Sequence, residues 1–91
     1  MKITKRNGNT TLYDDDKIVN SILNANQEVS GETISMTAAY NIADEVFIKL
    51  TENHEILTTV DVRVTTYSVL CEKGFPQTAK RYIEYRKRSS R

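Results

Sequence analysis

Residues 2–18 read KITKRNGNTTLYDDDKI, and this stretch decides the fold that the rest of the chain completes. Two short runs of strand-forming residues, 2–6 and 10–13, flank Asn7-Gly8. That dipeptide is typical of a two-residue type I′ hairpin turn, in which both central residues have positive φ. Acidic residues 14–16 then precede Lys17 and Ile18, as at a helix N-terminus. The sequence therefore predicts a β-hairpin that leads directly into a helix.

The rest of the chain predicts three more helices and one short extended segment. Apolar spacing indicates a second helix from Ser35, a plausible N-cap, to Thr51. A third helix should begin after Thr59, whose hydroxyl can cap it, and end at Gly74 as the C′ residue. Pro76 suits the first turn of a fourth helix. The inward-facing residues expected on the third helix are Val60, Val64, Tyr67, Leu70 and Cys71.

Residues 55–58 are the other short extended candidate. A lone two-stranded hairpin is marginal in water, so it needs a third strand or a layer of helices. The predicted fold class is α+β, with an N-terminal β-hairpin and a short third strand capping a four-helix bundle. At 91 residues the chain is expected to be a single domain, 1–91, with a basic tail at 86–91.

Composition excludes several classes of protein and site. Cys71 is the only cysteine, so the chain cannot form an internal disulfide or a multi-cysteine zinc site. No apolar run exceeds three residues, whereas a membrane span needs about 20, which predicts a cytoplasmic protein without membrane contact. The glycines Gly8, Gly31 and Gly74 fit neither a P-loop nor a dinucleotide fingerprint. Catalysis by this chain alone is not expected, and no metal site is predicted.

The remaining chemical signal is a group of cations near the hairpin, namely Lys5, Arg6 and Lys17. One interpretation is a solvated hairpin whose cations are neutralised by the three aspartates. Another concerns the C-terminal segment 80–91, which carries six basic residues against one acidic residue. Such a tail could contact nucleic-acid phosphates, although a net charge of only +1 and an acidic body argue against this partner.

Five segments in register resemble the ATP-cone family, and together they cover essentially the whole chain. The matching segments are Ile3-Thr4-Lys5-Arg6-Asn7-Gly8, Tyr13-Asp14, Lys17-Ile18 with Ser21-Ile22 and Ala25, Thr58-Thr59-Val60-Asp61-Val62, and Ala79 with Tyr82-Ile83-Glu84-Tyr85-Arg86. The resemblance implies a domain with a small three-stranded sheet over four helices. Such a domain binds ATP or dATP, which Mg²⁺ can accompany, and senses the nucleotide without consuming it.

The resemblance also implies a role for each matching residue. The backbone around Ile3 and the side chain of Ile18 would border adenine, and the hairpin turn would include Asn7 and Gly8. The phosphate-binding residues would be Lys5, Arg6 and Lys17, while Thr59 and Arg63 would close the site. Asn7 stands where the family commonly has Asp, and Arg63 stands where some members have His. The implied partner is a ribonucleotide reductase subunit, or a second copy of the chain, whose oligomeric state the nucleotide would control.

Overall fold

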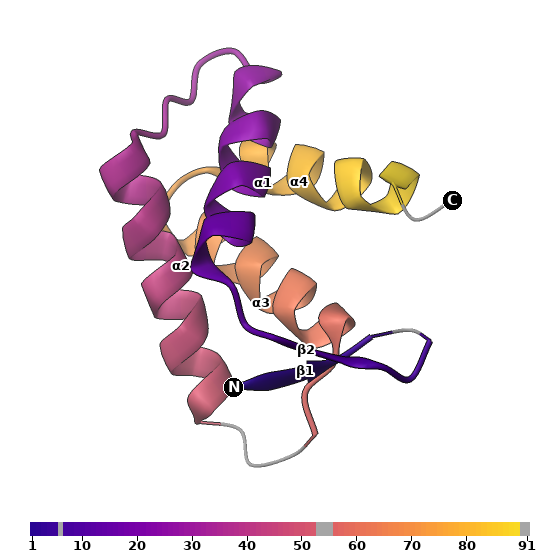
Figure 1. Cartoon of the computed structure of the whole chain (residues 1–91). Helices are drawn as coiled ribbons and strands as arrows, with labels where there is room; N and C mark the ends of the chain where they lie inside the picture. Colours follow the sequence, from indigo (N-terminus) through magenta and orange to yellow (C-terminus); the bar gives the residue numbers. More distant parts are fainter. Residues whose placement is uncertain (6, 53–55, 90–91) are drawn as a thin grey trace.

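The computed structural model describes residues 1–5, 7–52 and 56–89, with the side chains of the last helix described as far as Glu84. Two strands and four helices follow one another along the chain (Figure 1). They are β1 (Lys2–Thr4), β2 (Thr10–Leu12), α1 (Asp15–Gln27), α2 (Met36–Thr51), α3 (Thr59–Glu72) and α4 (Pro76–Ser89). None of these helices is both long enough and apolar enough to cross a bilayer.

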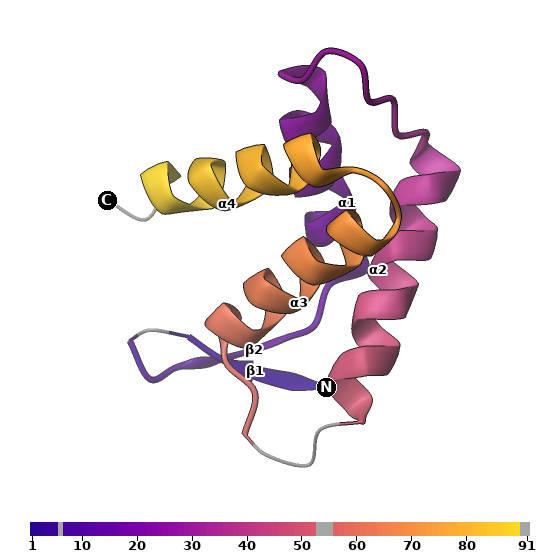
Figure 2. The ribbon, with the colours of Figure 1, turned by 180° about the vertical axis from the view of Figure 1, so that it is seen from behind.

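The four helices form a ring around one hydrophobic core. α1 and α3 each pack against both α2 and α4, and the hairpin crosses one end of the ring beside the start of α3 (Figures 1 and 2). Burying an aliphatic side chain contributes about 1.5–3 kcal/mol, so this shared core supplies most of the favourable energy. Its fully buried aliphatic members are Val19, Ile22, Ile42, Val46, Val69 and Leu70.

The hairpin is attached to the helices by a few specific contacts. Ile3 is buried in the core, and the Thr4 N–H donates to the Leu57 carbonyl at 2.9 Å. The Tyr13 hydroxyl donates to the Ala43 carbonyl of α2 at 2.7 Å. In the described part of the expected third strand, 56–58, the structure shows a single parallel bridge between Thr4 and Thr58, and Glu55 lies outside the described residues. The chain turns into α3 directly after that bridge, so the segment pairs at one position and does not extend the ladder.

The hairpin turn differs from the predicted two-residue type. Gly8 has φ of 87°, and no described non-glycine residue has positive φ. The Gly8 N–H donates to the Lys5 carbonyl at 3.0 Å, and the Lys5 N–H donates to the Asn9 carbonyl at 2.7 Å. Among the described residues of the turn, Gly8 alone adopts the left-handed conformation, as expected for a longer turn that ends in a bulge. The prediction that Asn7 also has positive φ was therefore wrong.

Side chains cap the helices close to where local sequence predicted. The Asp14 carboxylate accepts from the N–H groups of Asp16 and Lys17 at the start of α1, and Ser35 caps α2 as predicted. The cap of α3 is Thr58, one residue before the predicted Thr59. Thr58 forms a reciprocal capping box with Asp61, whose carboxylate accepts from the Thr58 N–H at 2.7 Å.

The link between α3 and α4 confirms the predicted glycine and proline positions. Gly74, with φ of 91°, follows the C-cap of α3, and Pro76 is the first residue of α4. The Phe75 N–H donates to the Leu70 carbonyl at 2.9 Å, and the Gly74 N–H donates to the Cys71 carbonyl at 3.1 Å. This pair of bonds is a Schellman motif, which satisfies the last carbonyls of α3.

The predicted inward face of α3 was partly wrong. Leu70 is fully buried as predicted and Cys71 is partly buried, but Val60 and Val64 are 48% and 55% exposed and Tyr67 is 38% exposed. The side turned to the core instead carries Val62, Thr66, Val69 and Leu70. The buried Thr66 hydroxyl donates to the Val62 carbonyl at 2.7 Å, which makes its burial tolerable.

A polar cluster, here called the clasp, joins the connector after α1 to the start of α4, and it consists of Asn26, Glu32 and Thr78. The Glu32 carboxylate accepts from the Thr78 N–H and hydroxyl, both at 2.8 Å, and from the Gln77 N–H at 3.0 Å. The Asn26 amide donates to the Thr78 hydroxyl and the Glu32 carbonyl, and accepts from the Ile34 N–H. Glu32 therefore caps α4 from a distant part of the chain.

The clasp predicts an acid-sensitive component of stability. Burial opposes the charge of Glu32, but the hydrogen bonds from Thr78 and Gln77 outweigh it and lower the Glu32 pKa below its ordinary 4.5. A carboxyl group with a lowered folded pKa stabilises the fold above its unfolded pKa, and this stability is lost as pH falls through the folded value. The parent should therefore have a higher melting temperature than Glu32→Gln near pH 7. The two melting temperatures should converge as pH falls below 4.5.

The matched control is Glu52→Gln, because Glu52 is an exposed carboxylate at the C-terminal end of α2. We expect its melting curves to follow the parent at every pH. A difference between parent and Glu32→Gln that stays constant down to pH 3 would mean that the charge of Glu32 contributes nothing.

Candidate functional site

A pocket of about 110 Å³ lies between the hairpin and the helices, open on one side to solvent. β1, β2, α1, α3 and α4 all contribute to its wall, whereas α2 contributes none of the lining. The lining residues are Ile3, Thr11, Leu12, Tyr13, Asp14, Lys17, Ile18, Ser21, Thr59, Val62, Arg63 and Tyr82. A site assembled from five elements exists only when the hairpin is docked on the helices.

One part of the wall is apolar and firmly supported. Ile3 of β1, Ile18 of α1 and Tyr82 of α4 are at most 7% exposed, and Val62 of α3 packs against them at the core boundary. Small-molecule sites are lined mainly by aliphatic and aromatic side chains, so this part of the wall suits an apolar group of a ligand. Because these residues belong to the hydrophobic core, this part of the wall forms as the domain folds.

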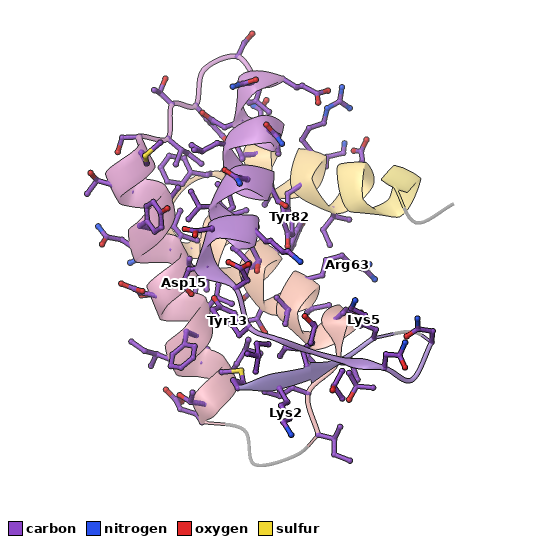
Figure 3. All side chains as sticks on the ribbon, in the orientation of Figure 1. Lys2, Lys5, Tyr13, Asp15, Arg63 and Tyr82 are labelled. Carbon is purple, nitrogen blue, oxygen red and sulfur yellow. The ribbon has the colours of Figure 1, made fainter. Side chains whose placement is uncertain are left out.

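Cationic groups border the open part of the pocket. Lys17 and Arg63 line it, and Lys5 lies two residues after Ile3, which places it on the Ile3 face of the hairpin. In Figure 3, Lys5 and Arg63 both lie in the space between the hairpin and α4, whereas Lys2 points away from the helices. Within the described part of the chain, the charged groups of Lys5, Lys17 and Arg63 make no hydrogen bond or ion pair.

The three aspartates are engaged elsewhere, so the neutralised-hairpin interpretation is not supported. Asp14 caps α1 through backbone N–H groups, and Asp16 accepts from the Tyr40 hydroxyl at 2.7 Å. Burial, followed by the charges of Asp44, Asp16 and Asp14, raises the pKa of Asp15. Among the described residues, none of the three aspartates forms an ion pair with Lys5 or Lys17.

Two helices also begin at the pocket. Asp14 and Lys17 belong to the cap and first turn of α1, and Thr59 is the first residue of α3. A helix N-terminus carries roughly half a positive charge, which favours anions. At α1 the carboxylates of Asp14, Asp15 and Asp16 oppose this effect, and at α3 that of Asp61 does, so the positive charge at the pocket comes chiefly from Lys17 and Arg63. Together with the apolar wall, this arrangement suits a ligand with an apolar end and an anionic end.

Tyr13 fixes the position of β2 against the helices at the pocket edge. Its ring meets the edge of Phe47 with ring centres 5.3 Å apart, and its hydroxyl is bonded to Ala43. Burial, followed by the nearby charges of Asp15 and Asp44, raises the pKa of Tyr13 well above its ordinary value. The hydroxyl remains a neutral donor, so the contact between hairpin and α2 is maintained at every physiological pH.

The structure brings most of the sequence-predicted site residues together. Ile3, Lys17, Ile18, Thr59 and Arg63 all line the pocket, and Lys5 stands on the same face beside it.

The turn residues are placed differently from the others. Asn7 and Gly8 are exposed and are not part of the pocket wall, so their contribution is to shape the turn that carries Lys5. Arg6 lies outside the described residues.

Sequence reasoning assigned no pocket role to seven lining residues. They are Thr11, Leu12, Tyr13, Asp14, Ser21, Val62 and Tyr82. Ser21 could have been found, because it follows Lys17 by one helical turn, and Val62 follows Thr59 in the same way. No local signal identifies Tyr82, a buried core residue that reaches the pocket from the last helix.

Two comparisons with known proteins show what this chain is similar to. The family model described as "ATP cone domain" matches residues 1–91. A 2-phosphoglycerate kinase of Pyrococcus horikoshii is 39% identical over 62 residues, which are 67% of this chain and 21% of the kinase. The chain thus spans about a fifth of the length of that relative.

Proposed function

The chain belongs to the ATP-cone family, and on that premise we propose that its pocket binds ATP or dATP as a regulatory ligand. The observation that carries the proposal is that one pocket combines a buried apolar wall with Lys17 and Arg63, which make no ion pair among the described residues. A nucleotide has the same division into a flat base and an anionic chain. A nucleotide-binding regulatory role is the general property of the family, whereas the choice of ATP and dATP is our assignment.

The size of the pocket limits how much of the nucleotide it can take in. Drug-sized ligands occupy sites of about 300–1,000 Å³, and an apolar cavity of about 150 Å³ accepts one benzene ring. At about 110 Å³ and open to solvent, this pocket would take in part of the larger adenine ring, against Ile3, Ile18 and Val62. The ribose and phosphates then lie along the open side.

The phosphates would contact the cations at that open side. Lys17 and Arg63 line it, Lys5 approaches from the hairpin, and Arg6 is assigned here by family resemblance alone. An arginine side chain grips a phosphate through a planar fork, and lysines act as mobile point charges. Thr59 would add a hydroxyl at the start of α3, and Asn7 and Gly8 would support the site indirectly through the turn.

Mg²⁺ would arrive with the nucleotide, not at a site of its own. Asp14 is the carboxylate of the pocket lining, and its carboxylate already caps α1. Among the residues with described positions, no group of three His, Cys, Asp or Glu side chains could hold a metal ion. Mg²⁺ commonly binds through substrate phosphates and keeps several waters, so no further protein ligand is required.

A regulatory domain must respond differently to its ligands, because equal affinity for both states shifts no equilibrium. We assign the response to oligomeric state, with a ribonucleotide reductase subunit or a second copy of this chain as the partner. The kinase relative favours a second candidate, in which the cone regulates a larger enzyme of phosphorylated small molecules. The two candidates use the same nucleotide pocket and differ in the enzyme that the domain regulates.

Titration calorimetry with ATP, dATP and a short DNA duplex tests the proposal. We expect both nucleotides to bind at one site, and we expect the duplex to release no heat at 150 mM salt. Undetectable nucleotide binding by the folded chain would overturn the assignment. Salt-sensitive duplex binding would instead favour the basic tail 86–91, whose side chains lie outside the described residues.

Sedimentation velocity then tests regulation. The chain should show different mass distributions with saturating ATP and dATP, either alone or when joined to its host enzyme. Identical distributions and identical host activity with both ligands would leave a nucleotide-binding domain without an allosteric role.

A further inference from the structure

The clasp and the nucleotide pocket share helix α4. Thr78 of the clasp and Tyr82 of the pocket wall are four residues apart, which puts both side chains on one face of the helix. Thr78 is fully buried and Tyr82 is 3% exposed. A movement of α4 at Thr78 is therefore transmitted to Tyr82 through a single helical turn.

Apolar packing and the clasp both position α4. Among the described side chains of this helix, Thr78, Ala79 and Tyr82 are buried and Ile83 is partly buried against the core. Hydrophobic contact is non-directional, so it fixes the axial position of a helix end less specifically than a set of hydrogen bonds does. Hydrogen bonds are directional, and those of Glu32 to the first turn of α4 measure 2.8–3.0 Å.

The clasp is also satisfied internally, which makes it specific. The Thr78 hydroxyl accepts from the Asn26 amide at 3.0 Å and donates to Glu32 at 2.8 Å. The other amide contacts of Asn26 hold the connector that carries Glu32. A shift of α4 along its axis would break several of these bonds together.

We propose that Glu32 is a positioning residue for nucleotide binding. By capping α4 it fixes how far the Tyr82 ring stands in the pocket wall, although Glu32 itself does not line the pocket. The inference rests on the proposed function, because its measured quantity is nucleotide affinity. It adds to that function a residue outside the pocket that sets the shape of the pocket.

The test measures ATP affinity and thermal stability of Glu32→Ala. Affinity is measured at a temperature at which melting curves show every variant to be fully folded. If α4 is correctly placed in only a third to a tenth of the molecules, the apparent Kd rises about 3- to 10-fold. The conservative Glu32→Gln retains one acceptor and should recover part of the affinity.

A second variant, Thr78→Val, keeps the side-chain volume and removes the hydroxyl. It provides the test if Glu32→Ala does not fold.

Two controls separate positioning from a general loss of stability. Ile42→Val removes a methylene from the core on α2, which lines no part of the pocket, so it should lower the melting temperature and leave Kd unchanged. Glu28→Ala removes an exposed ion pair of 3.0 Å between Glu28 and Arg81 of α4. This variant should change neither the melting temperature nor Kd much. In NMR spectra, the Tyr82 ring signals should shift in Glu32→Ala and remain in place in Ile42→Val.

The outcomes distinguish the two levels of inference. If the parent chain fails to bind ATP, the proposed function falls. If the parent binds and the folded clasp variants bind equally tightly, the function stands and the positioning role of Glu32 is overturned. A raised Kd that the destabilised Ile42→Val shows to the same extent would also overturn it.

Discussion

Replacing Tyr82 with alanine should cost about 3–5 kcal/mol of unfolding free energy, the usual range for truncating a buried aromatic residue. The ring is 3% exposed on α4 and forms part of both the core and the pocket wall. Removing it leaves a cavity that opens directly into the pocket. Urea denaturation followed by circular dichroism gives the loss of stability, and calorimetry on the remaining folded protein should show weakened ATP binding.

Tyr82→Phe is the matched variant, because it keeps the ring and removes only the hydroxyl. A hydrogen bond contributes about 0.5–1.5 kcal/mol, so the loss should be much smaller than for alanine. Equal losses in both variants would show that the hydroxyl, not the ring, is what matters at this position. A loss below about 1 kcal/mol for alanine would mean that the ring does not fill the core as described.

Lys17→Ala should weaken ATP binding by about 10- to 150-fold, while the fold survives. A hydrogen bond to a charged group contributes about 1.5–3 kcal/mol, which corresponds to that change in Kd. Lys17 is exposed in the first turn of α1, where a cation interacts unfavourably with the helix dipole. Removing its charge therefore does not destabilise the helix. Calorimetry measures the affinity, and the melting temperature verifies the fold. Arg63→Ala and Lys5→Ala should act in the same direction.

Lys2→Ala is the control for this series. Lys2 carries the same charge on the same hairpin, is exposed, and points away from the helices (Figure 3). It should change ATP affinity by less than about twofold, because only screened long-range attraction is lost. If Lys2→Ala and Lys17→Ala weaken binding equally, the effect is one of net charge and Lys17 is not a phosphate ligand.

The helix boundaries were predictable because their signals act within a few residues. Asp14, Ser35 and Pro76 each lie at or beside the start of the helix that they were predicted to begin. Gly74 likewise ends α3 where positive φ is needed. Caps and turn glycines satisfy backbone groups locally, so no knowledge of tertiary packing was required.

The face of α3 was not predictable in the same way. Its valines occur at positions 60, 62, 64 and 69, so both sides of the helix are apolar and periodicity does not select one. The choice follows from the positions of α2 and α4, which pack against the side of Val62 and Val69. Only the complete fold contains that information.

The candidate site was predictable in part. Lys17 and Ile18, which the family resemblance assigned to the site, both line the pocket, because adjacent residues at a helix start remain together in any packing. Tyr82 enters the wall from the last helix, 64 residues after Ile18 in the numbering, so its role depended on topology. The clasp joins residues separated by up to 52 positions and had no local signal.

The small number of contacts between the hairpin and the helices has a consequence for how ligand binding changes the local stability of the domain. Among the described contacts that attach the hairpin are the burial of Ile3, one backbone bond to Leu57 and one hydroxyl bond to Ala43, so we expect the hairpin to undock at a lower free-energy cost than the helices. A nucleotide held between it and the helices raises that cost by about 2.7 kcal/mol at a hundredfold excess over Kd. If the nucleotide binds as proposed, the bound and free domains would differ chiefly in how often this edge opens, and a neighbouring protein would sense the nucleotide as a change in local stiffness without any change in the average shape of the domain.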